Sequence, residues 1–197
     1  MQLRRVVVTG LGAITPLGND VNSFFHGLRT GVSGAGLITH FDTEKFKVKF
    51  ACEVKNFNTE DFFDRKEARK MDPFTQYAMV AADEAIHHSG ILQQTYNPDR
   101  IGVVWGAGIG GLSTFFAEIV DYARGDGTPR FSPFFIPKMI VDIAPGYISI
   151  KHGFRGPNYC TVSACASSTH SLIDAFNLIR LGKADAIVSG GSEASVN

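Results

Sequence analysis

The sequence has no excess of charge of either sign. Its 197 residues include 19 Lys and Arg against 19 Asp and Glu, so the formal net charge is zero. A protein that binds nucleic acid or an anionic membrane by general attraction carries a basic excess. We therefore expect no nucleic-acid partner and no membrane association. No apolar run is long enough to span a bilayer, and the run after Arg4 and Arg5 reaches Gly10 too soon for a signal peptide.

Cysteine is also scarce. Cys52, Cys160 and Cys165 form no C-x-x-C pair and no disulfide framework. Together with the missing signal peptide, this usage predicts a protein of the reducing cytoplasm. An apolar content of 44% and a charged content of 19% are typical of a globular domain with a real core.

Apolar runs and helical periods alternate along the chain. Strands are predicted at residues 3–9, 100–105, 158–162 and 184–189, with a hairpin or edge strand at 47–54. Helices are predicted at residues 20–28, 61–70, 73–89, 112–123 and 138–151, and an aromatic loop at 125–137. Asp72 before Pro73 forms an N-cap. The alternation predicts an α/β fold with a mostly parallel sheet.

The sequence ends at an unusual place for a parallel sheet. It comes directly after the last predicted strand, where a parallel sheet needs a further crossover. We therefore expect residues 1–197 to be a piece of a longer protein.

Residues 157–182 organise the rest of the chain. A short strand, a turn of the small residues Ser163 and Ala164, and a buried helix from Cys165 to Leu181 follow one another. The Cys165 thiol thus lies at a helix N-terminus, where the helix dipole and unpaired N–H groups lower a cysteine pKa from about 8.5 to roughly 3.5–7.5. The same N–H groups stabilise a developing oxyanion. An inert cysteine in a tight turn explains the pattern equally well.

Three patterns point instead to a nucleotide-dependent oxidoreductase. Residues 106–111 read G-x-G-x-x-G after a strand. Residues 6–10 (VVVTG) resemble the opening of short-chain dehydrogenases, and Tyr147-x-x-x-Lys151 matches the catalytic pair of that family. The spacing disagrees, because no second strand ends in an acid about 20 residues after the glycine loop. Ile14 and Pro16 also stand where the dehydrogenase N-terminal loop has glycines. An NAD(P)-dependent short-chain oxidoreductase stays as the less favoured alternative, since tight turns explain the glycines too.

Six motifs occur together in one order. They are residues 6–12 (VVVTGLG), 65–72 (RKEARKMD), 108–111 (GIGG), 132–137 (SPFFIP), 153–157 (GFRGP) and 164–165 (AC). With these motifs the chain resembles the β-ketoacyl-acyl-carrier-protein synthases, most closely the elongating type called synthase II. The resemblance covers this whole chain but only the N-terminal half of a family member.

The resemblance implies a thiolase-like fold, in which two similar halves form a five-layered α-β-α-β-α sandwich and the protein works as a homodimer. Residues 1–197 correspond to the N-terminal half, and the C-terminal half is absent from this chain. The histidines and lysine that the family uses for decarboxylation, and a phenylalanine that supplies part of the oxyanion hole, all follow residue 197. We therefore expect this chain alone to be inactive.

The implied activity is fatty-acid chain elongation by an acyltransferase. Cys165 takes an acyl group from acyl carrier protein, and the carbanion formed by decarboxylation of malonyl carrier protein then attacks the acyl-cysteine in a Claisen condensation. Acyl carrier protein carrying acyl and malonyl groups is the implied partner. Neither a cofactor nor a metal is implied.

The resemblance also assigns roles to five other residues. Ile109 and Phe134 match apolar positions that line the family's acyl tunnel, although ordinary core packing explains Phe134 as well. Lys66, Arg69 and Lys70 match positions that dock the acidic carrier protein. Their charge pattern alone favours a solvated helix face.

A second function is compatible with the same fold. A partner that resembles a chain-length factor pairs with an active synthase and does no catalysis. Cys165 argues against this function, because such partners lose the nucleophile. No histidine of this half is expected to replace the missing ones, since His170 lies roughly 140° round the helix from Cys165 and points away.

Overall fold

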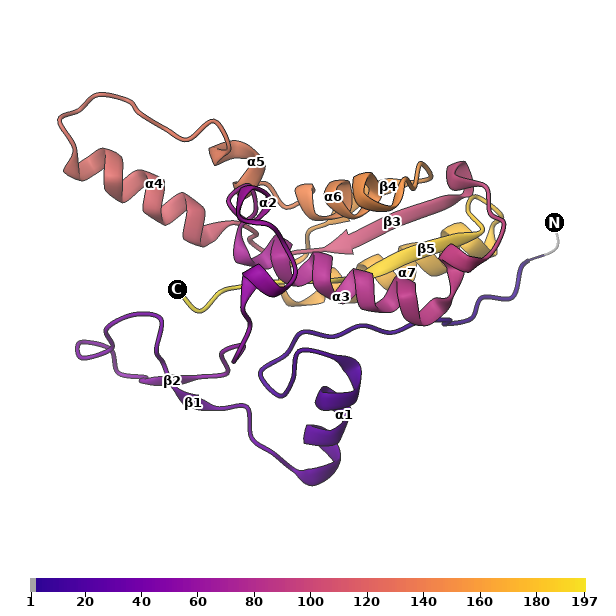
Figure 1. Cartoon of the computed structure of the whole chain (residues 1–197), viewed down its shortest axis with the longest axis horizontal. Coiled ribbons are helices and arrows are strands. Elements are labelled where there is room, and N and C mark those ends of the chain that lie inside the picture. Colours follow the sequence, from indigo (N-terminus) through magenta and orange to yellow (C-terminus); the bar gives the residue numbers. More distant parts are fainter. Residues whose placement is uncertain (1–2) are drawn as a thin grey trace.

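A three-stranded parallel sheet forms the centre of the computed structural model, which describes residues 3–197 (Figure 1). The strands β3 (Ile101–Gly106), β4 (Asn158–Thr161) and β5 (Ala186–Gly191) lie in the order β4-β3-β5. All six residues of the central strand β3 are buried, as its continuous apolar run predicts. Because the three strands are parallel, their carboxyl ends meet at one edge of the sheet.

Helices cover both faces of this sheet. Trp105 packs in a core with residues of α3 (Pro73–Ser89) and α6 (Ile143–His152), whereas a side chain at Gly106 would collide with the backbone of Ser167. Since neighbouring residues of a strand point to opposite faces, α7 (Ser167–Arg180) lies on the face opposite α3 and α6. The result is an α-β-α arrangement of layers, as Figure 1 shows.

The smaller elements lie around this core. They are α1 (Val21–Thr30), β1 (Gly36–Leu37), β2 (Phe50–Ala51), α2 (Arg65–Ala68), α4 (Leu112–Arg124) and α5 (Phe135–Met139). Of the hairpin or edge strand predicted at residues 47–54, the structure has the two-residue strand β2, which pairs antiparallel with β1. No helix among residues 3–197 is both long and apolar enough to cross a membrane.

One predicted helix needs correction here. The single helix predicted at 138–151 is divided into α5 and α6, and α5 begins inside the predicted aromatic loop. Pro145 explains the division, because in a continuous helix its ring would clash with the carbonyl of the residue four positions earlier, Val141. The helix α6 starts at Ile143, so that Pro145 falls in its first turn.

The strand predicted at residues 3–9 is absent. These residues are extended but pair with no strand, and Val7 and Val8 are 59% and 80% exposed. The chain that follows this segment lies directly against α3 instead. The absence of a side chain at Gly10 and Gly12 allows this close approach, since a Cβ at either position would collide with an α3 carbonyl. The valine run thus predicts extended backbone correctly, but a strand also needs a neighbour about 4.7–4.9 Å away.

The helix after Cys165 is less buried than predicted. A 3-10 turn (Ala164–Ala166) precedes α7. One side of α7 packs on the sheet. Its other side exposes Leu172, Ile173 and Phe176 at 53%, 50% and 42%. An apolar helix side of this kind on a folded protein marks a surface that another body covers.

The buried carboxylate of Asp72 joins α3 to α4. It is 1% exposed and accepts the Phe74 N–H at 3.4 Å, the Thr114 N–H at 3.0 Å and the Thr114 hydroxyl at 2.7 Å. The predicted N-cap is thus confirmed, and the bonds to Thr114 are an addition that the sequence did not reveal.

We predict that Asp72→Ala lowers the free energy of unfolding by about 3 kcal/mol, because a cap is lost and two buried groups of Thr114 lose their partner. Asp20→Ala, which removes the more exposed N-cap of α1, is the matched control and should cost about 1 kcal/mol. Denaturant unfolding of both variants measures the difference. Equal losses would contradict the role given to the Thr114 bonds.

Candidate active site

Three loops meet at the carboxyl edge of the sheet. The Cys165 turn follows β4, the glycine loop 107–111 follows β3, and residues 192–193 follow β5. Together they line a cavity of about 460 Å³, and both Cys165 and Ile109 are among its lining residues. Ligand sites in α/β proteins commonly lie outside the carboxyl ends of the strands.

The turn that carries Cys165 is tightly fixed. Ala164 has a φ of 51°, in the left-handed region that costs a residue with a side chain about 1–3 kcal/mol. The buried hydroxyl of Ser167 donates to the Ala164 carbonyl at 2.7 Å and accepts the Ser163 N–H at 2.8 Å. Thr161 in turn donates its hydroxyl to the Ser167 carbonyl at 2.8 Å. These bonds hold the strained turn and leave the Cys165 thiol exposed beside the cavity.

Glu193 fastens the glycine loop to the end of β5. Its Oε2 accepts the N–H groups of Gly108 and Ile109 at 2.8 and 2.7 Å, and its Oε1 accepts that of Gly110 at 3.1 Å. Three successive N–H groups of this kind form an anion-binding nest. Here a carboxylate of the chain itself fills the nest, so the loop does not offer it to the phosphates of a dinucleotide.

The predicted dehydrogenase pair is likewise engaged elsewhere. The ammonium group of Lys151 donates to the carboxylate of Asp83 on α3, which also bonds His152 Nε2 at 2.7 Å. Burial raises the pKa of Asp83, but hydrogen bonds from His152 and Lys151 outweigh burial and make the net shift downward. An ionised Asp83 thus holds Lys151 in a structural cluster between α3 and α6. The glycine loop and Lys151, which suggested an oxidoreductase, therefore have structural explanations.

The two residues predicted to line an acyl tunnel lie in different places. Ile109 is 57% exposed and lines the cavity with Cys165. Phe134 is 40% exposed, precedes α5 and does not line that cavity; the Lys70 ammonium lies 5.9 Å from its ring centroid. The structure thus brings Ile109 together with Cys165, and the tunnel role of Phe134 stays a prediction.

The predicted docking cations lie on and just after the short helix α2. Asp64 caps this helix by accepting the Lys66 N–H at 2.8 Å. Lys66 and Arg69 are exposed and Lys70 is half-buried. None of the three forms an ion pair with a carboxylate among residues 3–197. Their charges are therefore open to an acidic partner.

His170 lies closer to the turn than its helical position suggested. Its Nδ1 is 2.6 Å from the hydroxyl of Ser163, two residues before Cys165. No group of three or more His, Cys, Asp or Glu side chains placed to hold a metal occurs in the described part of the chain.

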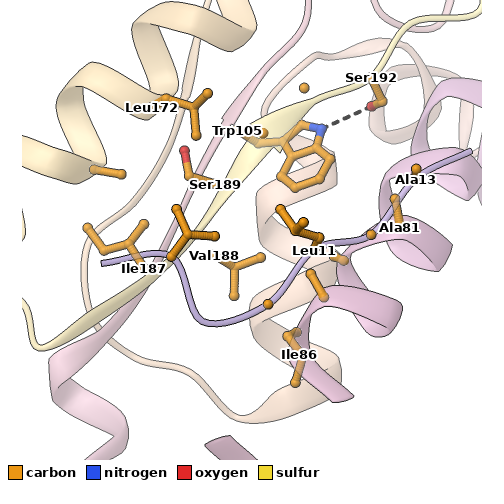
Figure 2. Close-up of a pocket in the computed structure, with 18 of the residues that line it drawn as sticks. Leu11, Ala13, Ala81, Ile86, Trp105, Leu172, Ile187, Val188, Ser189 and Ser192 are labelled. Carbon is orange, nitrogen blue, oxygen red and sulfur yellow. Dashed lines mark hydrogen bonds between the residues drawn. The ribbon is translucent and has the colours of Figure 1, made fainter. Parts of the chain in front are cut away.

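A second, larger cavity of about 860 Å³ adjoins the first (Figure 2). It is lined by residues 6–16, α3, β5 and α7, and Ser192 at its edge accepts the Trp105 indole N–H at 3.0 Å. Within residues 3–197, the backbone groups of residues 5–10 on its wall have no hydrogen-bond partner. On the opposite wall, β5 pairs with β3 alone. The cavity thus separates two extended segments that both have unpaired backbone.

Comparison with known proteins gives one consistent result. The family model described as the N-terminal domain of β-ketoacyl synthase matches residues 3–197. A curated relative, 3-oxoacyl-[acyl-carrier-protein] synthase 2 of Staphylococcus aureus (strain COL), is 49% identical over 196 residues, which is 99% of this chain and 47% of the relative. This chain therefore spans about half the length of the curated relatives it matches.

Solved structures agree on the fold. The ishigamide ketosynthase/chain length factor has a TM-score of 0.81 and 30% identity, over 98% of this chain and 48% of that one. A type II PKS acyl-carrier protein in complex with its ketosynthase gives a TM-score of 0.81 at 22% identity, over 95% of this chain and 50% of that one. The predicted fold class, half of a thiolase-like sandwich with a mostly parallel sheet, is confirmed.

The three cysteines are predicted to differ in reactivity. Burial raises the pKa of the Cys160 thiol to about 11, whereas Cys52 and Cys165 are exposed. A raised pKa keeps a thiol protonated, so at about pH 8 only about one Cys160 in a thousand is the reactive thiolate.

Alkylation with iodoacetamide, followed by peptide mass spectrometry over a pH series, checks this order. We expect the exposed Cys165 and Cys52 to react faster than the half-buried Cys160 throughout the series. Equal rates for all three thiols would contradict the raised pKa of Cys160.

Proposed function

The chain belongs to the β-ketoacyl synthase family, and from that premise we propose that its protein elongates fatty acids by decarboxylative condensation. The single observation that carries this proposal is the exposed Cys165 on a strained, fixed turn, beside a cavity walled by Ile109. A nucleophile on a sharp turn between strand and helix is a recurrent design for acyl transfer. The name of the relative from Staphylococcus aureus supports the same activity.

The proposed reaction has two stages. The Cys165 thiolate attacks the thioester carbonyl of acyl carrier protein, a new C–S bond to Sγ forms, and the C–S bond to the carrier breaks. The carrier leaves as a thiolate and takes up the proton that Cys165 had lost. Malonyl carrier protein then loses carbon dioxide, and its carbanion attacks the acyl-cysteine carbonyl. The new C–C bond forms as the bond to Sγ breaks, which returns Cys165. No residue described here is assigned to the decarboxylation.

A second segment is proposed to complete the fold. The exposed side of α7 and the larger cavity form one apolar surface, and the backbone groups on both walls of that cavity can pair with an extended segment placed between them. We assign this surface to the half that the relatives have beyond the matched region. Residues 1–197 are thus the N-terminal half of a ketosynthase, and we expect them to be inactive alone.

Acyl carrier protein is the proposed partner. The unpaired cations of Lys66, Arg69 and Lys70 support an acidic partner, and a ketosynthase with this fold is known in complex with an acyl-carrier protein. We also propose a homodimer, supported by the exposed apolar side chains of α4 and α5, among them Phe115, Phe116 and Ile136. A cytoplasmic location stays a prediction from the cysteine usage.

Cys165→Ala in the full-length protein tests the proposed activity. We expect it to abolish both transfer of radiolabelled acyl groups to the protein and condensation, with an unchanged thermal midpoint because alanine suits a turn of small residues. Cys52→Ala is the control and should keep both. A wild-type protein that never becomes acylated would favour the non-catalytic, chain-length-factor-like alternative.

Reversal of Lys66, Arg69 and Lys70 to glutamate tests the carrier-protein surface. Binding of acyl carrier protein should weaken at least tenfold and lose its salt dependence, since charge complementarity acts mainly on encounter and is screened by salt. Turnover of a small acyl thioester without the carrier protein should stay within about twofold. Equal loss with both substrates would show that these cations are structural.

A further inference from the structure

Glu193 is the side chain that holds the middle of the glycine loop, residues 108–110, toward the catalytic cavity, while the Ala107 N–H at the start of the loop donates to the Thr161 carbonyl at 3.3 Å. At its far end the loop is fixed by the Gly111 N–H, which donates to the Met139 carbonyl at 3.0 Å. Between these ends the N–H groups of Gly108, Ile109 and Gly110 all donate to Glu193. Both ends of the loop are thus fixed by backbone bonds, and the position of residues 108–110 relative to Cys165 depends on one carboxylate.

The loop backbone is shaped to fit this carboxylate. A side chain at Gly108 would put its Cβ 3.0 Å from Glu193 Oε2 and 3.6 Å from the Cα of Ala164. Gly110 has a φ of 82°, which residues with side chains rarely adopt. The loop thus lies directly between the end of β5 and the turn that carries the nucleophile.

The carboxylate also fixes a side chain in the cavity. Ile109 donates its own N–H to Glu193 at 2.7 Å, and its side chain is the largest apolar group that lines the cavity with Cys165. A β-branched side chain has few χ1 rotamers, so its direction follows its backbone. Holding the backbone of Ile109 therefore holds the wall that an acyl chain meets.

We propose that Glu193 is a positioning residue that sets the acyl-chain preference of the site by holding Ile109 against the cavity. The inference rests on the proposed function, since it needs an acyl chain on Cys165. It assigns no chemical step to Glu193, whose carboxylate is occupied by the three N–H groups. It also explains why a charged side chain follows directly after a strand of the sheet.

Glu193→Gln in the full-length protein tests this proposal. Glutamine keeps the size of the side chain but replaces one accepting oxygen by an amide that cannot accept, so at least one loop bond is lost. The test compares kcat/KM for acyl carrier protein that carries a short acyl chain with kcat/KM for acyl carrier protein that carries a long one. We expect the ratio of these two values to shift about tenfold, the order expected for one hydrogen bond to a charged group. Alkylation of Cys165 by iodoacetamide should stay within about twofold of wild type.

A double-mutant cycle shows whether Glu193 acts through Ile109. In an Ile109→Ala background, Glu193→Gln should shift the ratio no further, because the side chain that it positions is gone. Glu53→Gln is the matched control: its carboxylate accepts the Thr39 N–H at 2.9 Å and the Thr39 hydroxyl at 2.8 Å in a loop away from the site, and it should leave the ratio unchanged. A Glu193→Gln effect of the same size in both backgrounds would overturn the proposal.

The remaining outcomes are also decisive. A wild-type protein that is acylated at no chain length refutes the proposed function, whereas an acylated wild type with an unchanged ratio in Glu193→Gln refutes this inference alone. Equal losses for short and long chains with a lower thermal midpoint would show a purely structural role. Should Glu193→Gln not fold, Glu193→Asp, which keeps the charge but is one methylene too short for all three bonds, must show the same shift in ratio.

Discussion

The parallel pairing of β4, β3 and β5 is the constraint on which the site depends. Because the three carboxyl ends meet at one edge, residues that are far apart in sequence become neighbours: the turn with Cys165, the loop with Ile109 and the carboxylate of Glu193. Glycines at the strand ends let α7 begin against the sheet, which fixes the start of the helix and hence the turn that carries Cys165. The chemistry of this site therefore follows from sheet topology before any single side chain is considered.

Much of this arrangement could be predicted from the sequence, for physical reasons that differ between elements. The strand β3 was found because a central parallel strand is apolar throughout, and α3 because Asp72, Pro73 and Gly90 mark its ends. The strand, small turn and helix around Cys165 were predicted because their patterns follow one another without a gap, whereas the choice between an inert cysteine and a nucleophile rested on the family resemblance. These signals are local, so one sequence is enough to read them.

Other features depend on contacts that a single sequence does not contain. The valines of residues 3–9 gave no strand, because a strand needs a partner and the nearest edge is separated from it by a cavity. The glycine loop suggested a phosphate site, and only the structure shows that Glu193 fills the nest. The apolar side of α7 suggested complete burial, but in this chain that side is open.

The central claim is that the three loops at the sheet edge form one acyl-binding site around Cys165. The most direct measurement is a crystal structure of the full-length protein trapped with a long acyl chain on its nucleophile. The account predicts a thioester at Cys165 Sγ, a chain that runs along Ile109, and Glu193 still accepting the three N–H groups of the loop. An acyl group on another residue, or a chain that leaves Cys165 without contact to Ile109, would contradict it.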